Sequence, residues 1–366
     1  MSHAKKLFIS GTMRTGGSLI TNILSMHTKI LVFSERAHFF RFIYNRCGDL
    51  SERDVAMMLH QQNVRLRHRY KIEIDVESIL ENILKKEISY PVIYDELMKF
   101  FMRKEKKEIW IEYAAMHWDG IPRFLNFFKE GKAAHIIRDP RAVLASWKKL
   151  SSLPENVYLN CIFNWLDSAQ SMSQFKEILP SDRYLDLRYE DIHSDPENAV
   201  KRMCEYIGVT FEEDMIRGDT WEGKYDRRIV AIPRSAHDGN NITGFSEKRV
   251  RNWEKNLEEW EICLTETLLG AEMEKLGYQP FKEKYETQLV RKGFDILCKS
   301  PFLLKQLIQY FSSGTGTNQY PTDPTDPQSW GAPDNPSEWF LDSPESAAYF
   351  RDLEAVEHLM AKLYKQ

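Results

Sequence analysis

The chain has 366 residues, which exceeds an average domain of roughly 100–200 residues and predicts one large domain with an appendage. Hydrophobic residues make up 42% and aromatic residues 12%, which is enough to bury a core and excludes a wholly disordered chain. The net charge of -4 argues against a dedicated nucleic-acid-binding protein, which would carry a basic excess. Any anion site must therefore be a local feature.

Neither the N-terminal residues nor any later segment has the apolar character of a signal peptide or of the ~20-residue span that crosses a bilayer. The cysteines are scattered and never spaced CxxC, so we expect reduced core thiols, not a disulfide framework or a zinc site. They are Cys47, Cys161, Cys204, Cys263 and Cys298. These features predict a cytoplasmic protein without a transmembrane segment.

The chain is expected to open with a strand, a tight loop and a helix. Residues 7–9 form a short apolar run that stops at Gly11, and from Ser18 the apolar residues take helical spacing. Similar runs predict buried strands at 109–111, 133–137 and 184–187.

Two later helices carry end signals. Asp195 is a favourable cap residue and Pro196 suits a first turn, so a helix should begin there and end at Gly208. Another helix is expected from about Lys255 to Leu276. Strands that alternate with helices predict an α/β fold with a central parallel sheet flanked by helices.

The composition changes near Pro280, which predicts a domain over 1–280 and a helical extension over 281–366. A Pro/Gly/Ser-rich linker is expected near 312–337. The preceding stretch, 289–311, is amphipathic. An extra helix packed on the core is the preferred interpretation, and a partner-binding or membrane-surface helix is the alternative.

The segment from Gly11 to Ser18 fits the phosphate-loop frame GxxxxG-x-[ST], with Gly17 where a nucleotide triphosphatase needs lysine. Glycines let backbone amides approach an anion, and the following helix adds its positive end. Arg14 lies inside the loop and can supply the charge that the lysine would have given. A plain strand-to-helix turn is the alternative.

A second block places Arg138 directly after a predicted strand and Ser146 eight residues later, in the second turn of a helix. Both can converge on one phosphate, because ligands of open α/β sheets bind at the carboxyl ends of the strands. The alternative is that Arg138 pairs with a nearby carboxylate.

Together the two blocks resemble the sulfotransferases that use 3′-phosphoadenosine 5′-phosphosulfate (PAPS). The resemblance covers roughly residues 7–278 and implies a P-loop-like three-layer fold. It also implies that a loop holds the donor's 5′-phosphosulfate, and that Arg138 and Ser146 hold its 3′-phosphate. The loop residues are Arg14, Thr15, Gly16, Gly17 and Ser18. Many family members have threonine at position 17, so a hydroxyl contact is missing here.

Two further segments extend the resemblance. Residues 188–191 (Arg-Tyr-Glu-Asp) match a family feature whose tyrosine, here Tyr189, lies near the adenine. A basic segment ahead of a tryptophan resembles the one that closes over the nucleotide, with Ser246, Arg249 and Arg251 as candidate contacts. Its basic residue lies two places before the tryptophan, so the alignment there stays open by one residue.

In the bacterial and protein-tyrosine branches of this family, a glutamate takes the proton of the acceptor. Glu35, 21 residues after Arg14, is at a corresponding position and is our first candidate for the base. His38 is the second. An ion pair of Glu35 with Arg36 is the structural alternative.

The resemblance thus implies a sulfotransferase that moves a sulfuryl group from PAPS to a hydroxyl or amine, with Glu35 as general base and no metal required. The acceptor can be a small molecule, glycan, lipid or peptide, and no nucleic acid is expected as partner. A P-loop kinase or nucleotide triphosphatase and a catalytically inactive nucleotide-binding protein are the alternatives.

Overall fold

The structure is a computed structural model that describes residues 5–34, 36–70, 72–150, 156–217, 245, 249–318 and 353–363. Its centre is a five-stranded, all-parallel sheet with the strand order β2-β3-β1-β4-β5. The strands are β1 (Lys5–Gly11), β2 (Ile30–Ser34), β3 (Ile109–Tyr113), β4 (Lys132–Ile137) and β5 (Tyr184–Arg188). The α/β class and the strands predicted at 7–9, 109–111, 133–137 and 184–187 are confirmed.

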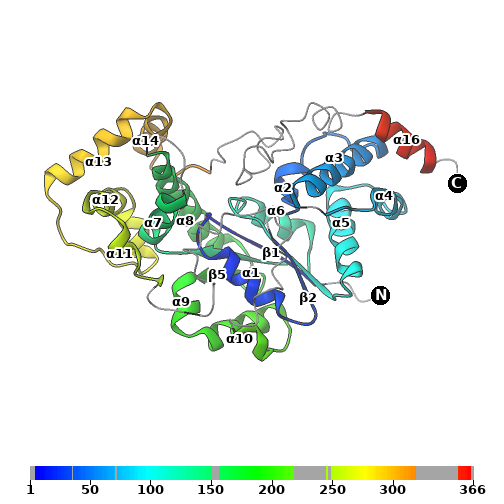
Figure 1. Cartoon of the computed structure of the whole chain (residues 1–366), viewed down its shortest axis with the longest axis horizontal. Helices are drawn as coiled ribbons and strands as arrows, with labels where there is room; N and C mark the ends of the chain where they lie inside the picture. The colour runs from blue at the N-terminus through cyan, green and yellow to red at the C-terminus, as the bar shows by residue number, and fades with distance from the viewer. Residues whose placement is uncertain are drawn as a thin grey trace.

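Helices lie on both faces and at both ends of the sheet (Figure 1). In the first half of the chain they are α1 (Gly17–Ser25), α2 (Phe39–Phe42), α3 (Glu52–Tyr70), α4 (Val76–Leu84), α5 (Tyr90–Lys104) and α6 (Gly120–Phe127). Then follow α7 (Pro140–Leu150), α8 (Asn160–Ile178), α9 (Tyr189–Ser194) and α10 (Pro196–Ile207). The last are α11 (Trp253–Asn256), α12 (Glu259–Lys275), α13 (Thr287–Lys299), α14 (Pro301–Ser313) and α16 (Leu353–Leu363). Short 3₁₀ turns cover Val157–Leu159 and Glu213–Met215.

The predicted helix at Pro196 is confirmed as α10. The Asp195 side chain caps it by accepting from the Asn198 N–H, and Gly208 ends it with a left-handed φ of 80°. The helix expected from about Lys255 to Leu276 is confirmed as α12, which begins at Glu259. A reciprocal capping box between Glu258 and Glu261 starts it there and separates it from the short α11.

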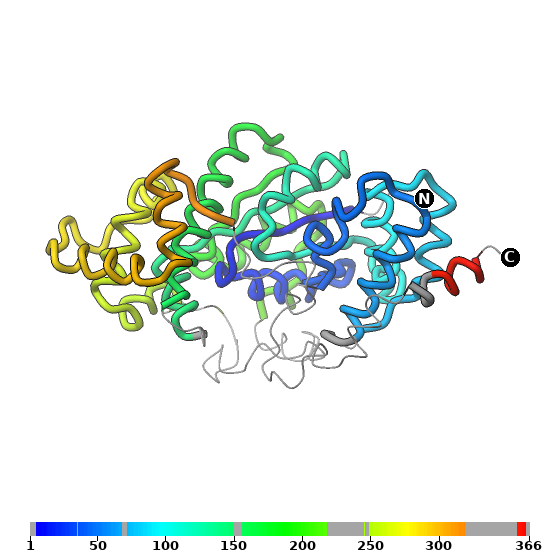
Figure 2. Tube along the Cα trace, turned by 90° about the horizontal axis from the view of Figure 1, so that it is seen from above, coloured from blue at the N-terminus to red at the C-terminus, as the bar shows by residue number. Residues whose placement is uncertain are grey.

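Two hydrophobic clusters make up the core. One contains the sheet with α1 and α3–α6, and the other joins α7 and α8 to α11–α14. Leu297, Leu303 and Leu307 of the amphipathic stretch are buried in the second cluster, so its two helices pack on the core as preferred. Figure 2 shows these helices at one end of the molecule and α16 at the other, where α16 packs on α3 and α4. Residues 319–352, which hold most of the predicted linker, lie outside the described residues.

All five cysteines are free thiols. Cys161, Cys204 and Cys263 are buried as expected, whereas Cys47 is half-buried and Cys298 is exposed on α13. The expectation of core thiols is therefore wrong for Cys298, because it faces away from the buried stripe of its helix. Among the helices that the structure describes, none is long and apolar enough to cross a bilayer.

His135, in the middle of β4, gives the fold a defined response to acid. It is fully buried between Ser168 and Tyr184, and burial lowers its pKa to about 3. The unfolded chain takes up this proton below about pH 6.5, whereas the folded chain does so only near pH 3. This residue's contribution to stability is therefore lost as the pH falls from about 6.5 toward 3.

We predict that His135→Gln reduces the acid sensitivity of the free energy of unfolding by about 1 kcal/mol per pH unit between pH 6 and 5. Urea denaturation at the two pH values measures this difference. His358→Gln, at an exposed position on α16, is the control and should keep the wild-type pH dependence. Equal pH dependence in the wild type and His135→Gln would contradict the prediction.

Candidate active site

The loop between β1 and α1 has the conformation of an anion cradle. Arg14 and Gly16 both take left-handed backbone angles, with φ of 71° and 102°. The Thr15 hydroxyl donates to the Thr12 carbonyl at 2.7 Å, which closes the turn. A β-carbon on Gly16 would overlap the Tyr189 ring, so glycine is required there for its angle and for space.

Arg14, Arg138 and Ser146 come together at the carboxyl edge of the sheet. The Arg14 Nε–H donates to the Ser146 hydroxyl at 2.8 Å, and Arg138 donates to the Arg14 carbonyl at 3.1 Å. Within the part of the chain that the structure describes, the hydrogen bonds of Arg138 go to main-chain carbonyls and not to a carboxylate. Arg14 therefore contacts both Arg138 and Ser146, the two residues predicted to converge on one phosphate.

The electrostatics of this group favour an anion. Burial and the neighbouring Arg138 lower the pKa of Arg14, because two guanidiniums share a poorly solvated place. The Nε of Arg138 is buried and has no hydrogen-bond partner among the described residues. A buried donor without a partner and two adjacent like charges both cost free energy, which a phosphate or sulfate between them would recover.

Tyr189 begins α9 directly after β5 and forms one wall of the site. The Arg138 guanidinium lies 4.1 Å from the centre of its ring, and the same ring covers Gly16. Tyr189, from the motif at 188–191, thus joins the end of β5 to the loop between β1 and α1.

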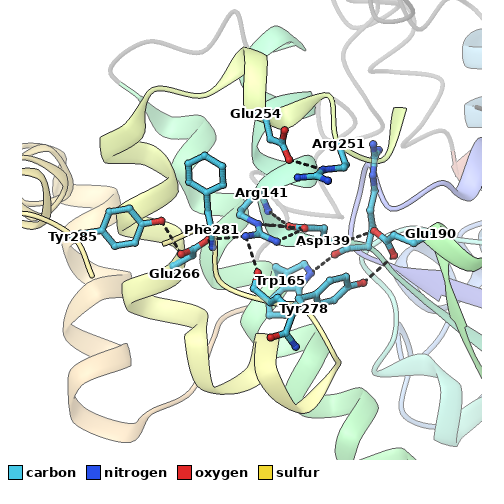
Figure 3. Close-up of polar contacts among 12 residues, drawn as sticks. Asp139, Arg141, Trp165, Glu190, Arg251, Glu254, Glu266, Tyr278, Phe281 and Tyr285 are labelled. Atoms are coloured by element: carbon cyan, nitrogen blue, oxygen red, sulfur yellow. Dashed lines mark hydrogen bonds and ion pairs between the residues drawn. The ribbon is translucent and has the colours of Figure 1, made fainter. Parts of the chain in front are cut away.

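A buried charge network holds the turn that carries Arg138 (Figure 3). Arg141, at the start of α7, makes ion pairs with Asp139 and Glu266, both at 2.6 Å, and lies over the Trp253 ring. It also donates to the Gln279 carbonyl at 3.0 Å. The turn between β4 and α7 is thereby fixed to α12 and to the chain that follows it.

Glu190 supports the same turn from the other side. Its carboxylate accepts from the Asp139 N–H at 2.9 Å and from the Tyr278 hydroxyl at 3.1 Å (Figure 3). Burial is the main cause that raises the pKa of Glu190. Sequence reasoning missed these supporting residues. Arg141 and Glu190 lie inside motifs that it quoted, whereas no local pattern marks Glu266 or Tyr278.

The predicted closing segment is described only in part. Ser246 lies outside the described residues, while the Arg249 carbonyl accepts from Arg138 at 3.1 Å. The Arg251 side chain is exposed and pairs with Glu254 at 2.6 Å (Figure 3). The structure therefore brings the backbone of this segment to the site but does not bring the Arg251 side chain there.

The two candidate bases follow β2 in the chain. Glu35, the first candidate base, lies outside the described residues. His38 is buried, has a left-handed φ of 44°, and lies with its ring centre 5.5 Å from that of His117. Burial first, then His38 and nearby arginines, lower the pKa of His117 well below its ordinary value. His117 is therefore neutral at pH 7.

The loop after β3 places His117 there. Met116 takes a left-handed φ of 64° and donates to the Gly11 carbonyl at 2.8 Å, and the His117 N–H donates to the Ser10 hydroxyl at 3.1 Å. On the other side, the buried Glu112 accepts from the Tyr94 hydroxyl and from the Phe39 N–H, which fixes the start of α2 beside His38. Strand β3 and the loop after it thus fix the residues around His38.

The fold is that of a P-loop-like protein, with a candidate anion site at the carboxyl edge of its sheet. A sequence model of the sulfotransferase family matches residues 6–213, more than half of the chain. The chain therefore belongs to the sulfotransferase family.

A relative of established function is the omega-hydroxy-beta-dihydromenaquinone-9 sulfotransferase of Mycobacterium tuberculosis and Mycobacterium bovis. It is 23% identical over 152 residues, which cover 38% of this chain and 38% of the relative. The match thus spans well under half of that enzyme's length.

The sulfotransferase domain of the curacin biosynthetic pathway has a TM-score of 0.50 at 16% identity, and the match covers 76% of this chain and 99% of that domain. It confirms the fold. The sulfotransferase domain of a Synechococcus olefin synthase gives a TM-score of 0.46 at 18% identity, with 73% and 96% covered.

We predict that Arg141→Met lowers the free energy of unfolding by about 3–5 kcal/mol, because it leaves Asp139 and Glu266 as buried, unpaired carboxylates. Urea denaturation measures the loss. Arg291→Met, the same change in an exposed pair with Asp295 on α13, is the control and should cost less than about 1 kcal/mol. Equal losses in the two variants would show that the network does not hold the turn.

Proposed function

We propose that this sulfotransferase uses PAPS as donor and transfers its sulfuryl group to a hydroxyl, or to an amine, of an acceptor. The observation that carries the proposal is the meeting of Arg14, Arg138 and Ser146 in front of the first turn of α1. Two adjacent guanidiniums, a hydroxyl and a helix N-terminus suit a ligand with two separate anionic groups.

In this proposal the donor lies along the carboxyl ends of β1, β4 and β5. The loop amides, with Arg14, Thr15 and Ser18, bind the 5′-phosphosulfate, and Arg138 and Ser146 bind the 3′-phosphate. Tyr189 lies near the adenine, consistent with its ring between Gly16 and Arg138. Ser246, Arg249 and Arg251 belong to the segment that closes over the nucleotide. The exposed Arg251 would have to leave Glu254 to take part.

The reaction is an in-line displacement at sulfur. The acceptor oxygen forms a bond to sulfur while the bond from sulfur to the 5′-phosphate oxygen breaks, and adenosine 3′,5′-bisphosphate (PAP) leaves with the electron pair. The acceptor's proton passes to the carboxylate of Glu35, with His38 as the second candidate. The loop amides and Arg14 stabilise charge on the transferring and leaving oxygens, so positioning and electrostatics supply most of the acceleration.

The alternatives separate by simple observations. A kinase or nucleotide triphosphatase would require ATP, and the loop has Gly17 where such enzymes need a lysine. An inactive nucleotide-binding protein would bind PAP without turnover. For the acceptor, the mycobacterial relative's name points to a lipid hydroxyl, while small molecules, glycans and peptides complete the panel to be tested. We place the reaction in the cytoplasm.

We predict that the wild type binds PAP but not ATP in isothermal titration, and that Arg138→Ala weakens PAP binding by about 10- to 100-fold, because a charged hydrogen bond to phosphate is lost. Ser146→Ala should cost less, about tenfold, since it loses a neutral hydroxyl contact. Lys201→Ala, in an exposed pair on α10, is the control and should bind like the wild type. Binding of ATP alone would instead support a phosphotransferase.

We predict that Glu35→Gln lowers kcat by about 10²- to 10⁴-fold and leaves PAP affinity unchanged, because it removes only the proton acceptor. Radiolabelled sulfuryl transfer from PAPS to a panel with a phenol, a polyprenol, a sugar and a tyrosyl peptide measures this. His38→Gln is the matched comparison. A larger loss of kcat in His38→Gln than in Glu35→Gln would reverse the order of the two candidates.

A further inference from the structure

Gly17 is the one position where the phosphate-binding loop departs from the family pattern. It is the first residue of α1, and its backbone angle is not among the left-handed ones that require glycine. A glycine there costs roughly 0.5–1 kcal/mol relative to alanine. The backbone therefore does not explain why this position is a glycine.

Tyr113 does explain it. A β-carbon on Gly17 would overlap with Cζ and Oη of the Tyr113 side chain. The phenol of Tyr113 therefore occupies the space in which a side chain at position 17 would begin. Tyrosine at position 113 therefore excludes any residue but glycine at position 17. A larger residue at 17 would require a smaller one at 113.

The phenol is held on a rigid support. Tyr113 is the last residue of β3 and pairs in register with Ile9 of β1 and Ser34 of β2. Directly after it, the Ala114 N–H donates to the Ile9 carbonyl, and the Ala114 carbonyl accepts from the Ser10 hydroxyl at 2.6 Å. Only 4% of Tyr113 is exposed. Its position at the edge of the loop is thus fixed by the strand.

The hydroxyl end of this side chain lies beside Gly17, in the first turn of α1. It lies against the N-terminus of α1, where free backbone N–H groups gather. Tyr113 also acts to raise the pKa of Arg14, against the larger lowering by burial, which places the phenol within electrostatic reach of that guanidinium. A phenol O–H in this place is one more hydrogen-bond donor aimed at an anion.

We propose that Tyr113 is a donor-binding residue of this sulfotransferase, whose hydroxyl donates a hydrogen bond to the phosphosulfate and replaces the hydroxyl that the residue at position 17 lacks. The inference rests on the proposed function. A hydrogen bond to the oxygen between phosphorus and sulfur strengthens as charge develops there, so the phenol contributes more to transfer than to binding. No proton needs to leave the phenol.

Tyr113→Phe tests this with the smallest change, because it removes the hydroxyl and keeps the ring against Gly17. We expect the melting temperature to stay near the wild-type value. PAP affinity should fall by about tenfold, because the same oxygen carries its full charge in PAP, and kcat for sulfuryl transfer should fall by roughly 10²-fold. Tyr206→Phe is the matched control, since its hydroxyl donates to the Ala133 carbonyl at the opposite edge of the sheet. It should keep the wild-type kcat.

A reciprocal exchange separates the hydroxyl from the packing. Gly17→Thr alone should lower the melting temperature, because the new side chain overlaps Tyr113. In the Tyr113→Ala background, Gly17→Thr should instead raise kcat about tenfold over Tyr113→Ala alone, because it returns a hydroxyl to the same place. Failure of this recovery, together with a normal kcat in Tyr113→Phe, would reduce Tyr113 to a packing residue.

The wild type and Tyr113→Phe together distinguish a failure of this inference from a failure of the proposed function. If the wild type binds PAP and transfers sulfuryl groups while Tyr113→Phe is unchanged, only this inference is overturned. If the wild type neither binds PAP nor uses PAPS, the proposed function is overturned and this inference falls with it.

Discussion

The placement of two half-buried arginines, Arg14 and Arg138, at one edge of the sheet is the constraint on which the rest of the site depends. Burial of Arg14 and then the like charge of Arg138 lower the pKa of Arg14. The fold holds them together because β1 and β4 are neighbouring parallel strands, so the chain leaving each strand arrives at the same edge. A dianionic ligand would neutralise the charges of the two arginines. The contacts around them keep both in place.

Much of that support comes from far along the chain. The family match ends at residue 213, yet Glu266 of α12 and Tyr278 complete the network around the turn that carries Arg138. Arg141 connects the two parts, since it pairs with Asp139 on one side and Glu266 on the other. Helix α12 is thus part of the support of the candidate anion site, and α12–α14 share a core with α7 and α8.

The region around His38 and His117 is shaped by backbone conformation. His38 and Met116 take left-handed backbone angles, as Arg14 does in the loop between β1 and α1. Strained positions of this kind persist only where the surrounding structure holds them, and here they gather along one edge of the sheet. A buried carboxylate, Glu112, fixes the start of α2 beside His38.

Sequence patterns predicted the elements whose signals are local. A few neighbouring residues are enough to predict such elements. Examples are the apolar runs of β1, β3, β4 and β5, the glycines of the loop and the cap at Asp195. The strand β2 was not predicted, because its five residues follow α1 without a separating turn signal. Helices α2–α6 were not predicted either, because their burial depends on partners distant in sequence. The break between α11 and α12 was also missed, because it depends on a capping box inside an otherwise helical run.

The sequence by itself determined which chemistry is present: the loop with Arg14, the strand ending before Arg138, and Ser146 eight residues on, because these are matters of spacing along one chain. Only the tertiary structure decided that Arg14 bonds to Ser146, that Arg141 reaches Glu266, and that Tyr113 takes the space beside Gly17. These contacts join residues far apart in sequence. Periodicity and turn propensity encode backbone geometry over a few residues, whereas the meeting of distant side chains follows from strand order and packing, which no local pattern contains.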